Sequence, residues 1–204
     1  MAAPLEVLDP VYPQPRKITR IASILAQGGL VVYPTDTNYG IGCDLLNRKA
    51  IDRLYRLKKR DRKRPMTFLC SDLSQAGRYA QVGHLAHRII KRLTPGPYTF
   101  VLQATKEVPK VVTTKQKTVG VRIPDSPVAI ALVEALGRPL LNTTATDSEG
   151  ELLGDPRDIK EIHGHGVDLI IDVGLNLFDL STVVDLTGEA PEVLREGKGA
   201  IDDI

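Results

Sequence analysis

The stretch LVVYPTDTNYGIG, residues 30–42, is the segment from which the fold can be inferred. Its first five residues form a short apolar run, which is typical of a buried β-strand. The hydroxyls of Thr35 and Thr37 follow directly, and the glycines at positions 40 and 42 would allow another group to approach the backbone closely. Because α/β proteins bind ligands where strands end, the segment predicts a ligand-binding loop, with an ordinary polar turn as the alternative.

Patterns on both sides of this stretch predict an alternation of helices and strands. Helical periodicity and capping residues predict helices over residues 17–27, 47–57, 85–93, 126–136 and 155–164. Apolar or alternating runs predict further strands over residues 66–70, 98–104, 118–124, 139–145, 167–174, 181–186 and 192–197. Several strands follow one another without a helix, so we expect one layered α/β domain with a mixed sheet over residues 17–204. Residues 1–16 are proline-rich and are expected to form an extended segment.

The composition is that of a globular protein. Of the 204 residues, 42% are hydrophobic and 25% are charged, with a net charge of +2, which argues against disorder and a coiled coil. Long apolar runs and a secretory pattern are not seen, so we expect no membrane association and a cytoplasmic location. Cys43 and Cys70 form no CxxC pair and predict free thiols in a reducing compartment. The histidines lack acidic or thiol neighbours at ligand spacing, so no metal site is expected.

The most unusual segment is RLYRLKKRDRKRP, residues 53–65, in which eight Lys and Arg residues accompany a single acid. An anionic partner would relieve the repulsion among these cations. Arg60 and Arg64 offer planar guanidiniums that suit phosphate oxygens, whereas Lys58 and Lys63 offer point charges. The segment therefore predicts binding of a phosphate from a nucleotide or from a nucleic-acid backbone. The alternative is a solvated helix end, where cations favour the helix dipole.

Further arginines and hydroxyls lie in or beside the predicted strands. Arg122 lies inside the apolar run VGVRIP, where a buried guanidinium is costly without an anion. Its partner is expected to be either an internal aspartate or a carboxylate or phosphate of a ligand. The segment NTTAT (142–146), Ser181 and Arg195 add polar side chains near other strand ends. Together these residues predict an anion pocket over the sheet; a GxSxG motif or Cys–His pattern for a covalent nucleophile is not present.

In this order, the segments resemble the YrdC/YciO superfamily of threonylcarbamoyl-AMP synthases and their relatives, and most closely the YciO branch. The similarity spans residues 30–199 and is carried by YPTDTNYGIGC, LKKRDRKRPM, TPGPYTFVL, TVGVRIPDSP, STVVDL and LREG. It implies a single YrdC-like domain with a twisted mixed sheet, flanking helices and a basic concave face. The synthases of this family convert L-threonine, bicarbonate and ATP into threonylcarbamoyl-adenylate and pyrophosphate for the t6A modification of tRNA, with Mg²⁺ bound to the nucleotide.

The resemblance also implies roles for individual residues. Contacts to L-threonine are expected from Thr35, Arg122, Asn142 and Ser181. Contacts to ATP are expected from Lys58, Arg60, Arg64, Thr118, Thr144 and Arg195. We expect these residues to converge on one pocket, where they would position the substrates and neutralise charge rather than supply a catalytic group.

One departure from the family pattern concerns the predicted strand over residues 139–145. The synthases carry S-x-N where this chain has Thr144, Ala145 and Thr146. Thr144 keeps a hydroxyl, but Thr146 lacks an amide that can both donate and accept. Because a missing polar contact typically costs about 1–3 kcal/mol, a weakened synthase activity is expected.

Two other functions are left open by the sequence. The family fold is associated with double-stranded RNA or tRNA, for which the candidate residues are Arg53, Arg56, Lys59, Arg62 and Lys63. Aromatic residues make up only 4% of the chain and Trp is absent, which argues against a stacking platform and fits recognition of shape and phosphates. The other hypothesis is a nucleotide-binding regulator without turnover, whose affinity for ATP would not respond to threonine.

Overall fold

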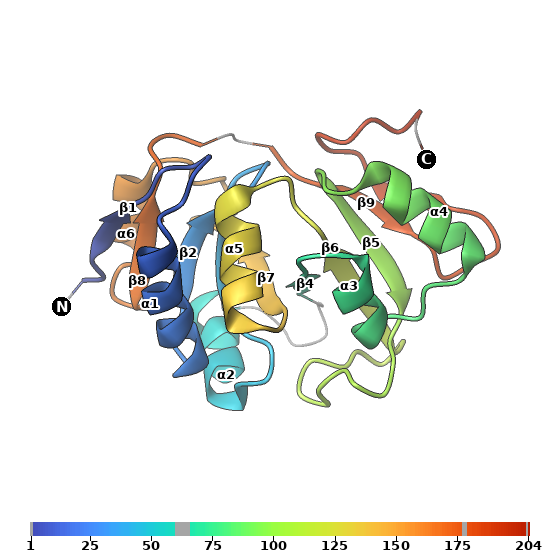
Figure 1. Cartoon of the computed structure of the whole chain (residues 1–204), viewed down its shortest axis with the longest axis horizontal. Helices are drawn as coiled ribbons and strands as arrows, with labels where there is room; N and C mark the ends of the chain where they lie inside the picture. Colours follow the sequence, from blue (N-terminus) through green and yellow to red (C-terminus); the bar gives the residue numbers. More distant parts are fainter. Residues whose placement is uncertain (1, 60–65, 177–178, 203) are drawn as a thin grey trace.

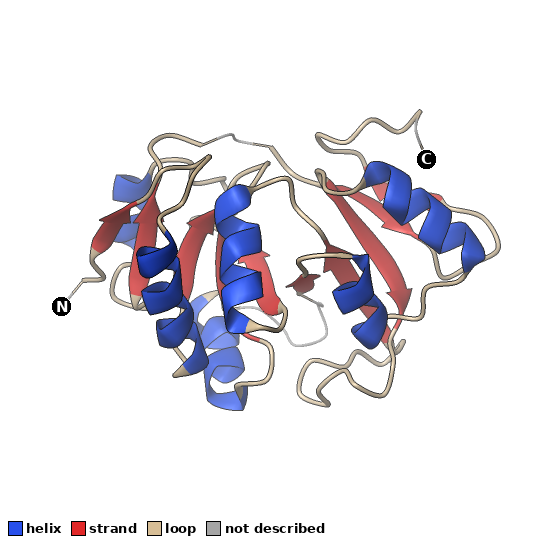
Figure 2. Ribbon diagram, in the orientation of Figure 1, coloured by secondary structure: helices blue, strands red, loops and turns tan. Residues whose placement is uncertain are grey.

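The computed structural model describes residues 2–59, 66–176, 179–202 and 204, and its strands form one sheet against which the helices pack (Figure 1, Figure 2). The strands are β1 (Leu5–Val7), β2 (Val31–Pro34), β3 (Tyr39–Asp44), β4 (Thr67–Leu69), β5 (Tyr98–Gln103), β6 (Thr118–Arg122), β7 (Leu140–Thr144), β8 (Leu169–Asp172), β9 (Thr182–Asp185) and β10 (Glu192–Arg195). The helices are α1 (Pro15–Ala26), α2 (Arg48–Leu57), α3 (Leu73–Tyr79), α4 (His84–Leu93), α5 (Pro127–Leu136) and α6 (Pro156–His163).

The sheet contains both parallel and antiparallel pairs. Its ten strands are hydrogen-bonded in the order β1-β8-β2-β3-β7-β4-β6-β5-β9-β10. The pairs β1–β8, β2–β8, β4–β6 and β5–β9 are parallel. The pairs β2–β3, β3–β7, β4–β7, β5–β6 and β9–β10 are antiparallel. The predicted α/β domain with a mixed sheet is thus confirmed.

Local sequence signals explain where the helices begin and end. The Ser126 hydroxyl accepts a hydrogen bond from the Ala129 amide, Pro127 opens α5, and Gly137 ends it with a φ of 75°. The Asn47 side chain caps α2 in the same way by accepting from the Ala50 amide. The capping residues seen in the structure agree with the boundaries of these two helices expected from the sequence.

Helices cover both faces of the sheet around β2. Val31 and Tyr33 of β2 belong to a core cluster with residues of α1 and α5, which lie side by side in Figure 1. Val32, between them, belongs to the second cluster, which includes Ile51 and Leu54 of α2. Since successive side chains of a strand point to opposite faces, α1 and α5 lie on one face and α2 on the other. α3 and α4 pack over the other half of the sheet, near β5 and β6.

The two glycines of β3 are required by close packing of side chains. A Cβ atom at Gly40 would collide with Oδ1 of Asn142, and one at Gly42 would lie 2.7 Å from the hydroxyl oxygen of Tyr33. Tyr33 in turn donates a hydrogen bond of 2.7 Å to Asn142 Oδ1. The close approach predicted for these glycines therefore involves neighbouring side chains of the sheet.

The structure differs from the sequence prediction in a few elements. Helix α1 begins at Pro15, two residues earlier than expected, because Gln14 is the N-cap and proline is favourable in the first turn. The expected extended segment contains β1, which adds an edge strand beside β8. The sequence pattern predicts neither β3 nor α3, since glycines interrupt both.

Candidate functional site

A cavity of about 360 Å³ lies over six neighbouring strands of the sheet, from β7 to β10 in the strand order. Its volume is near the lower end of the range of roughly 300–1,000 Å³ found for small-molecule sites. The described lining residues are Met66, Thr67, Thr99, Val101, Thr118, Gly120, Arg122, Asn142, Thr143, Thr144, Ser181, Val183 and Arg195. Most of them are polar, and none of these described residues is a carboxylate.

The alternation of β6 aims its polar residues at this cavity. Thr118, Gly120 and Arg122 line the cavity, whereas Val119 and Val121 between them are buried in the hydrophobic core. The period of two in a β-strand therefore explains how an arginine can lie within an apolar run. Arg122 is only 6% exposed, so its charge requires compensation.

Asp36 provides part of that compensation. Arg122 Nη2 lies 2.5 Å from Asp36 Oδ1 and 2.9 Å from Thr37 Oγ1. The internal aspartate that was one of the two expected partners is therefore present. However, Arg122 Nε is buried and has no hydrogen-bond partner among the described residues. The guanidinium thus keeps one N–H that a ligand oxygen could accept from.

Arg195 brings a second guanidinium to the same cavity. Its Nη2 and Nε donate to the Ser181 carbonyl at 2.7 and 3.1 Å, and Nη2 also lies 3.2 Å from Ser181 Oγ. Ser181 Oγ in turn lies 2.9 Å from Thr99 Oγ1. Burial, together with the nearby positive charge of Arg122, lowers the pKa of Arg195. Two neighbouring guanidiniums therefore share one described counter-charge, that of Asp36, which makes the cavity favourable for an anion.

Thr35 does not line the cavity but shapes the turn between β2 and β3. Its hydroxyl donates to the Asn38 carbonyl at 2.7 Å and lies 3.1 Å from Thr37 Oγ1. Thr37 contacts Arg122, so Thr35 affects the cavity only indirectly, through Thr37. The expected direct convergence of Thr35 with Arg122 is therefore replaced by contact through Thr37, because the hydroxyl of Thr35 turns back to its own loop.

The segment after β10 holds the same turn from the other side. Lys198 Nζ donates to the backbone oxygen of Asp36 at 2.6 Å, and the Lys198 amide donates to the Leu180 carbonyl at 2.8 Å. Thr182 Oγ1 donates to the Gly199 carbonyl at 2.7 Å. These hydrogen bonds hold residues that are far apart in the chain near the Arg122–Asp36 pair.

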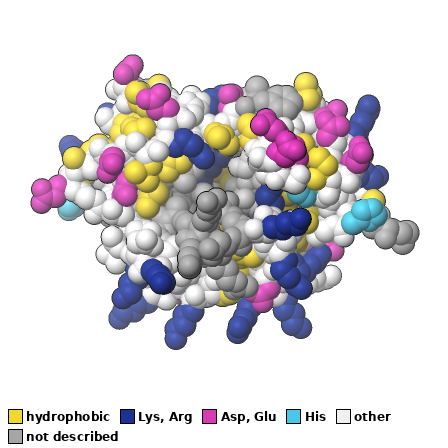
Figure 3. Space-filling view, turned by 180° about the vertical axis from the view of Figure 1, so that it is seen from behind, with side chains coloured by type: hydrophobic (Ala, Val, Ile, Leu, Met, Phe, Trp, Pro, Cys, Tyr) yellow, Lys and Arg dark blue, Asp and Glu magenta, His cyan; other side chains and the backbone are white. Residues whose placement is uncertain are grey.

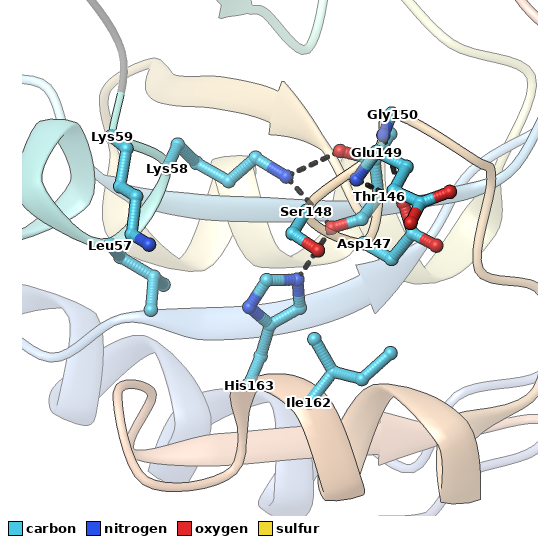
Figure 4. Close-up of a pocket in the computed structure, with 10 residues that line it drawn as sticks. All are labelled: Leu57, Lys58, Lys59, Thr146, Asp147, Ser148, Glu149, Gly150, Ile162 and His163. Atoms are coloured by element: carbon cyan, nitrogen blue, oxygen red, sulfur yellow. Dashed lines mark hydrogen bonds between the residues drawn. The ribbon is translucent and has the colours of Figure 1, made fainter.

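Lys58 lies at a second hollow rather than in the cavity. This hollow has a volume of about 810 Å³ and is drawn in Figure 4. Lys58 extends from the end of α2, and its ammonium donates to both the hydroxyl and the carbonyl oxygen of Thr146. Residues 142–144 line the cavity and Thr146 lines the hollow, so the end of β7 connects them. The residues expected to line a single pocket are therefore distributed between two spaces, the cavity and this second hollow.

The residues of the basic run have different positions. Arg60, Arg62, Lys63 and Arg64 lie outside the described residues. Arg53 forms an ion pair of 2.9 Å with Asp168 and donates to the Gly28 carbonyl, so its guanidinium has structural partners. The side chains of Arg56 and Lys59 are exposed.

Basic side chains also gather beyond the run. Figure 3 shows Lys and Arg side chains along the lower edge of the molecule, where α2 and the loop after β5 lie. The exposed cations of these two segments are Arg48, Lys49, Arg56, Lys59, Lys106, Lys110, Lys115 and Lys117. The four lysines of the loop were not among the residues predicted to bind a ligand, although their spacing along one segment was a visible signal.

Sequence reasoning also missed several residues around the cavity. Asp36 lies between two threonines that were noted, and its charge opposite an expected buried arginine was the available signal. Thr67 and Thr99 line the cavity from strands β4 and β5, where alternation with Phe68 and Phe100 indicates that they face away from the core. His163 contacts Thr146, and no local pattern distinguished it from a surface histidine.

Two features of the described residues concern membranes and metals. No helix in the described part of the chain is long and apolar enough to cross a membrane. Within the same residues, no cluster of three His, Cys, Asp or Glu side chains could hold a metal ion.

The chain has close relatives over nearly its whole length. It is 43% identical over 196 residues to an uncharacterized protein of Haemophilus influenzae, with 95% of each chain covered. It is 41% identical to the protein YciO of Escherichia coli, again with 95% of each chain covered. The crystal structure of E. coli YciO matches with a TM-score of 0.94, 39% identity and 98% coverage of both chains.

More distant relatives include proteins named as threonylcarbamoyl-AMP synthases. The threonylcarbamoyl-AMP synthase of Pyrococcus abyssi is 32% identical over 92% of this chain, which spans 56% of that synthase. A crystal structure of P. abyssi Sua5 complexed with L-threonine matches with a TM-score of 0.89 and 30% identity, over 96% of this chain and 58% of that one. The family described as Telomere recombination, Sua5_yciO_yrdC, matches residues 23–197. The chain therefore belongs to the Sua5/YciO/YrdC family, with higher identity to the YciO proteins than to the P. abyssi synthase.

Proposed function

We propose that this protein is an ATP-dependent enzyme of the threonylcarbamoyl-AMP synthase type, with an activity weaker than that of the synthases. The observation that carries the proposal is the cavity with two neighbouring guanidiniums, several hydroxyls and no carboxylate among its described lining residues. Such a site favours an anionic ligand with additional hydrogen-bonding groups. An amino acid offers a carboxylate, and L-threonine adds a hydroxyl.

The cavity is assigned to L-threonine. Its carboxylate would accept from Arg122, whose Nε is buried without a partner in the described part of the chain. Ser181 and Asn142 line the same space and would contact the rest of the amino acid. Thr35 would act as a positioning residue through Thr37. The L-threonine complex of P. abyssi Sua5 supports this assignment by analogy.

The nucleotide is assigned to the rest of the cavity and to the second hollow. Thr118, Thr144 and Arg195 line the cavity, and Lys58 lies beyond the end of β7. These residues would contact the phosphates of ATP, together with Arg60 and Arg64, which lie outside the described residues. Mg²⁺ would enter as the complex with ATP, and most of its ligands would be phosphate oxygens and water.

The proposed reaction needs no covalent intermediate on the protein. The amine of L-threonine condenses with bicarbonate to give a carbamate and water. A carbamate oxygen then attacks the α-phosphorus of ATP, and the bond to the β-phosphate oxygen breaks to release pyrophosphate. The protein would contribute by holding the carbamate and the triphosphate together and by neutralising their charges with Arg122, Arg195 and Lys58.

The departure from S-x-N supports the weaker activity. Thr144 lines the cavity and keeps a hydroxyl. Thr146 lies in the second hollow, and its hydroxyl is engaged by Lys58 at 2.6 Å. Asn142 supplies an amide in the cavity, but its Oδ1 accepts from Tyr33 and is therefore committed to the sheet. The role of an amide at position 146 is thus only partly replaced.

The proposal is tested by measuring pyrophosphate and threonylcarbamoyl-adenylate with L-threonine, bicarbonate and MgATP. Product should form only when all three are present, and Arg195→Lys should reduce it by roughly tenfold, since the bidentate guanidinium is lost. The exposed control variant Arg88→Lys should leave it unchanged. Absence of product even at high protein concentration would contradict the proposed synthase activity. ATP binding that does not respond to L-threonine would instead indicate a regulator without turnover.

Binding of double-stranded RNA or tRNA is a second candidate function. The basic edge formed by α2 and the loop after β5 favours it, because exposed cations from two distant segments gather there (Figure 3). Arg56 and Lys59 belong to this edge, whereas Arg53 is engaged with Asp168. RNA affinity should fall steeply with salt concentration in proportion to the phosphates contacted. A competition experiment between ATP and RNA distinguishes a shared site from separate ones.

A further inference from the structure

Two side chains from separate elements, those of Lys58 and His163, meet at the carbonyl oxygen of Thr146 in the second hollow (Figure 4). Lys58 Nζ lies 3.0 Å from Thr146 O and 2.6 Å from Thr146 Oγ1. His163 Nε2 lies 2.8 Å from the same Thr146 O. Because a carbonyl oxygen can only accept, Nε2 of His163 carries the hydrogen. The lysine and the imidazole therefore share the two lone pairs of one oxygen.

We propose that Thr146 and His163 are positioning residues that hold the ammonium of Lys58 at the end of β7, where it meets the phosphates of ATP. This inference rests on the proposed function, because that function gives Lys58 its phosphate-binding role. Lys58 follows directly after α2, Thr146 follows β7, and His163 ends α6. The three elements thus determine together where the charge of Lys58 is placed.

The arrangement prepares a flexible side chain for binding. A lysine has a long stem with many rotamers, and fixing them at the moment of binding reduces affinity. Two hydrogen bonds to Thr146 fix the ammonium before any ligand arrives. His163 is 7% exposed and fixes the carbonyl that Lys58 contacts.

The imidazole of His163 suits this position because it is neutral near pH 7. Burial lowers its pKa, the hydrogen bond to Thr146 opposes that shift, and the charge of Lys58 lowers the pKa further. A neutral donor at the Thr146 carbonyl therefore adds no charge that would repel the lysine. This combination also gives the threonine at position 146 a use of its own: its hydroxyl takes part in holding Lys58 where the synthases have an asparagine.

The first test measures the reactivity of Lys58 directly. The protein is acetylated with a limiting amount of an acetylating reagent, and the rates at Lys58 and at its exposed neighbour Lys59 are compared by mass spectrometry. Thr146→Val removes the hydroxyl with little change in shape, and Thr146→Ser keeps it. We expect the Lys58 rate to rise by about tenfold in Thr146→Val relative to Lys59, and to change little in Thr146→Ser. An unchanged ratio in Thr146→Val would overturn the proposal.

The second test asks whether Thr146 acts on ATP through Lys58. ATP affinity is measured for the wild type, Thr146→Val, Lys58→Ala and the double variant. We expect Thr146→Val to weaken binding by about tenfold in the wild-type background and to have no further effect once Lys58 is alanine. His163→Leu should weaken binding in the same coupled manner, while His163→Gln, which retains a donor, should restore much of it. Additive losses would overturn the positioning role.

The two tests separate this inference from the proposed function. Absence of ATP binding by the wild type would contradict the proposed function and, with it, the assigned role of the held lysine. Intact ATP binding with Lys58 reactivity that does not depend on Thr146 would contradict the positioning alone.

Discussion

Arg122 and Asp36 form a buried ion pair in which Nη2 and Oδ1 lie 2.5 Å apart. Their side chains are 7% and 9% exposed. One further atom of each, Nε of Arg122 and Oδ2 of Asp36, is buried without a partner among the described residues. The ion pair therefore leaves part of the hydrogen-bonding capacity of Arg122 unused. An anion bound in the cavity could accept from this guanidinium and stabilise the buried charge.

Neutralising Asp36 should destabilise the protein strongly. In Asp36→Asn the guanidinium of Arg122 stays buried beside Arg195 without its counter-charge, and loss of one partner of a buried pair costs about 3–5 kcal/mol. The free energy of unfolding, measured by urea denaturation, should fall by about that amount. Asp125→Asn, at an exposed position, is the matched control and should have little effect. A loss below about 1 kcal/mol in Asp36→Asn would show that Arg122 has found other compensation.

Two glycine-to-alanine substitutions should change stability in opposite directions. At Gly40 the added methyl group would collide with Asn142, so Gly40→Ala should lower the free energy of unfolding by about 1–3 kcal/mol. At Gly77, within α3, a Cβ atom would meet no atom within 4 Å, so alanine should raise it by about 0.5–1 kcal/mol. Equal effects at both positions would contradict the packing of Gly40 against Asn142. Because Asn142 lines the cavity, Gly40→Ala should also weaken threonine binding.

The stability of the protein should depend on His163 below neutral pH. Its pKa in the folded state is lowered from 6.5, chiefly by burial. The unfolded chain therefore binds the proton more readily, and the stability that His163 contributes above pH 6.5 is lost as the pH falls through this value toward the lower folded pKa. Unfolding free energies measured between pH 7.5 and pH 5 should show a smaller slope in His163→Gln than in the wild type. His84→Gln, at an exposed position, should leave the slope as it is.

The two cysteines should resist modification while the protein is folded. Cys43 and Cys70 are both fully buried free thiols, and burial raises the pKa of each, with Asp44 and Asp72 as smaller contributions. Since the thiolate is the reactive form, a disulfide reagent should react at least about 100-fold more slowly with the native protein than with the protein in denaturant. Rapid labelling of one cysteine under native conditions would place that thiol at an opening in the core.

Much of the fold could be predicted because local signals and tertiary packing agree. Ser126, Pro127 and Gly137 bound α5 in the structure as the sequence indicates, and the apolar runs around β2 and β8 become buried strands. Strand β3 could not be predicted in this way. Its glycines reduce β-propensity locally, and only the neighbouring side chains of Tyr33 and Asn142 reveal why they are needed.

The site was predictable in its residue types more than in its geometry. Arg122, Ser181 and Arg195 meet over the sheet as expected, since strand ends gather polar groups from distant parts of the chain. The separation of Lys58 from them could not be inferred, because it depends on the hydrogen bonds to Thr146 that form only after β7 and α2 have packed. The position of His163 depends in the same way on the packing of α6 near this segment.

The short segment after β10 has a practical consequence for anyone who handles the protein. Lys198 donates to the backbone oxygen of Asp36, and the Gly199 carbonyl accepts from Thr182. A displacement of this segment would therefore disturb Asp36 and, through it, Arg122, which lines the cavity. An affinity tag or fusion partner attached after this segment would strain the hydrogen bonds of Lys198 and Gly199. Strand β1 lies at the opposite edge of the sheet. A tag placed before β1 therefore leaves these hydrogen bonds undisturbed and is the better choice for binding assays.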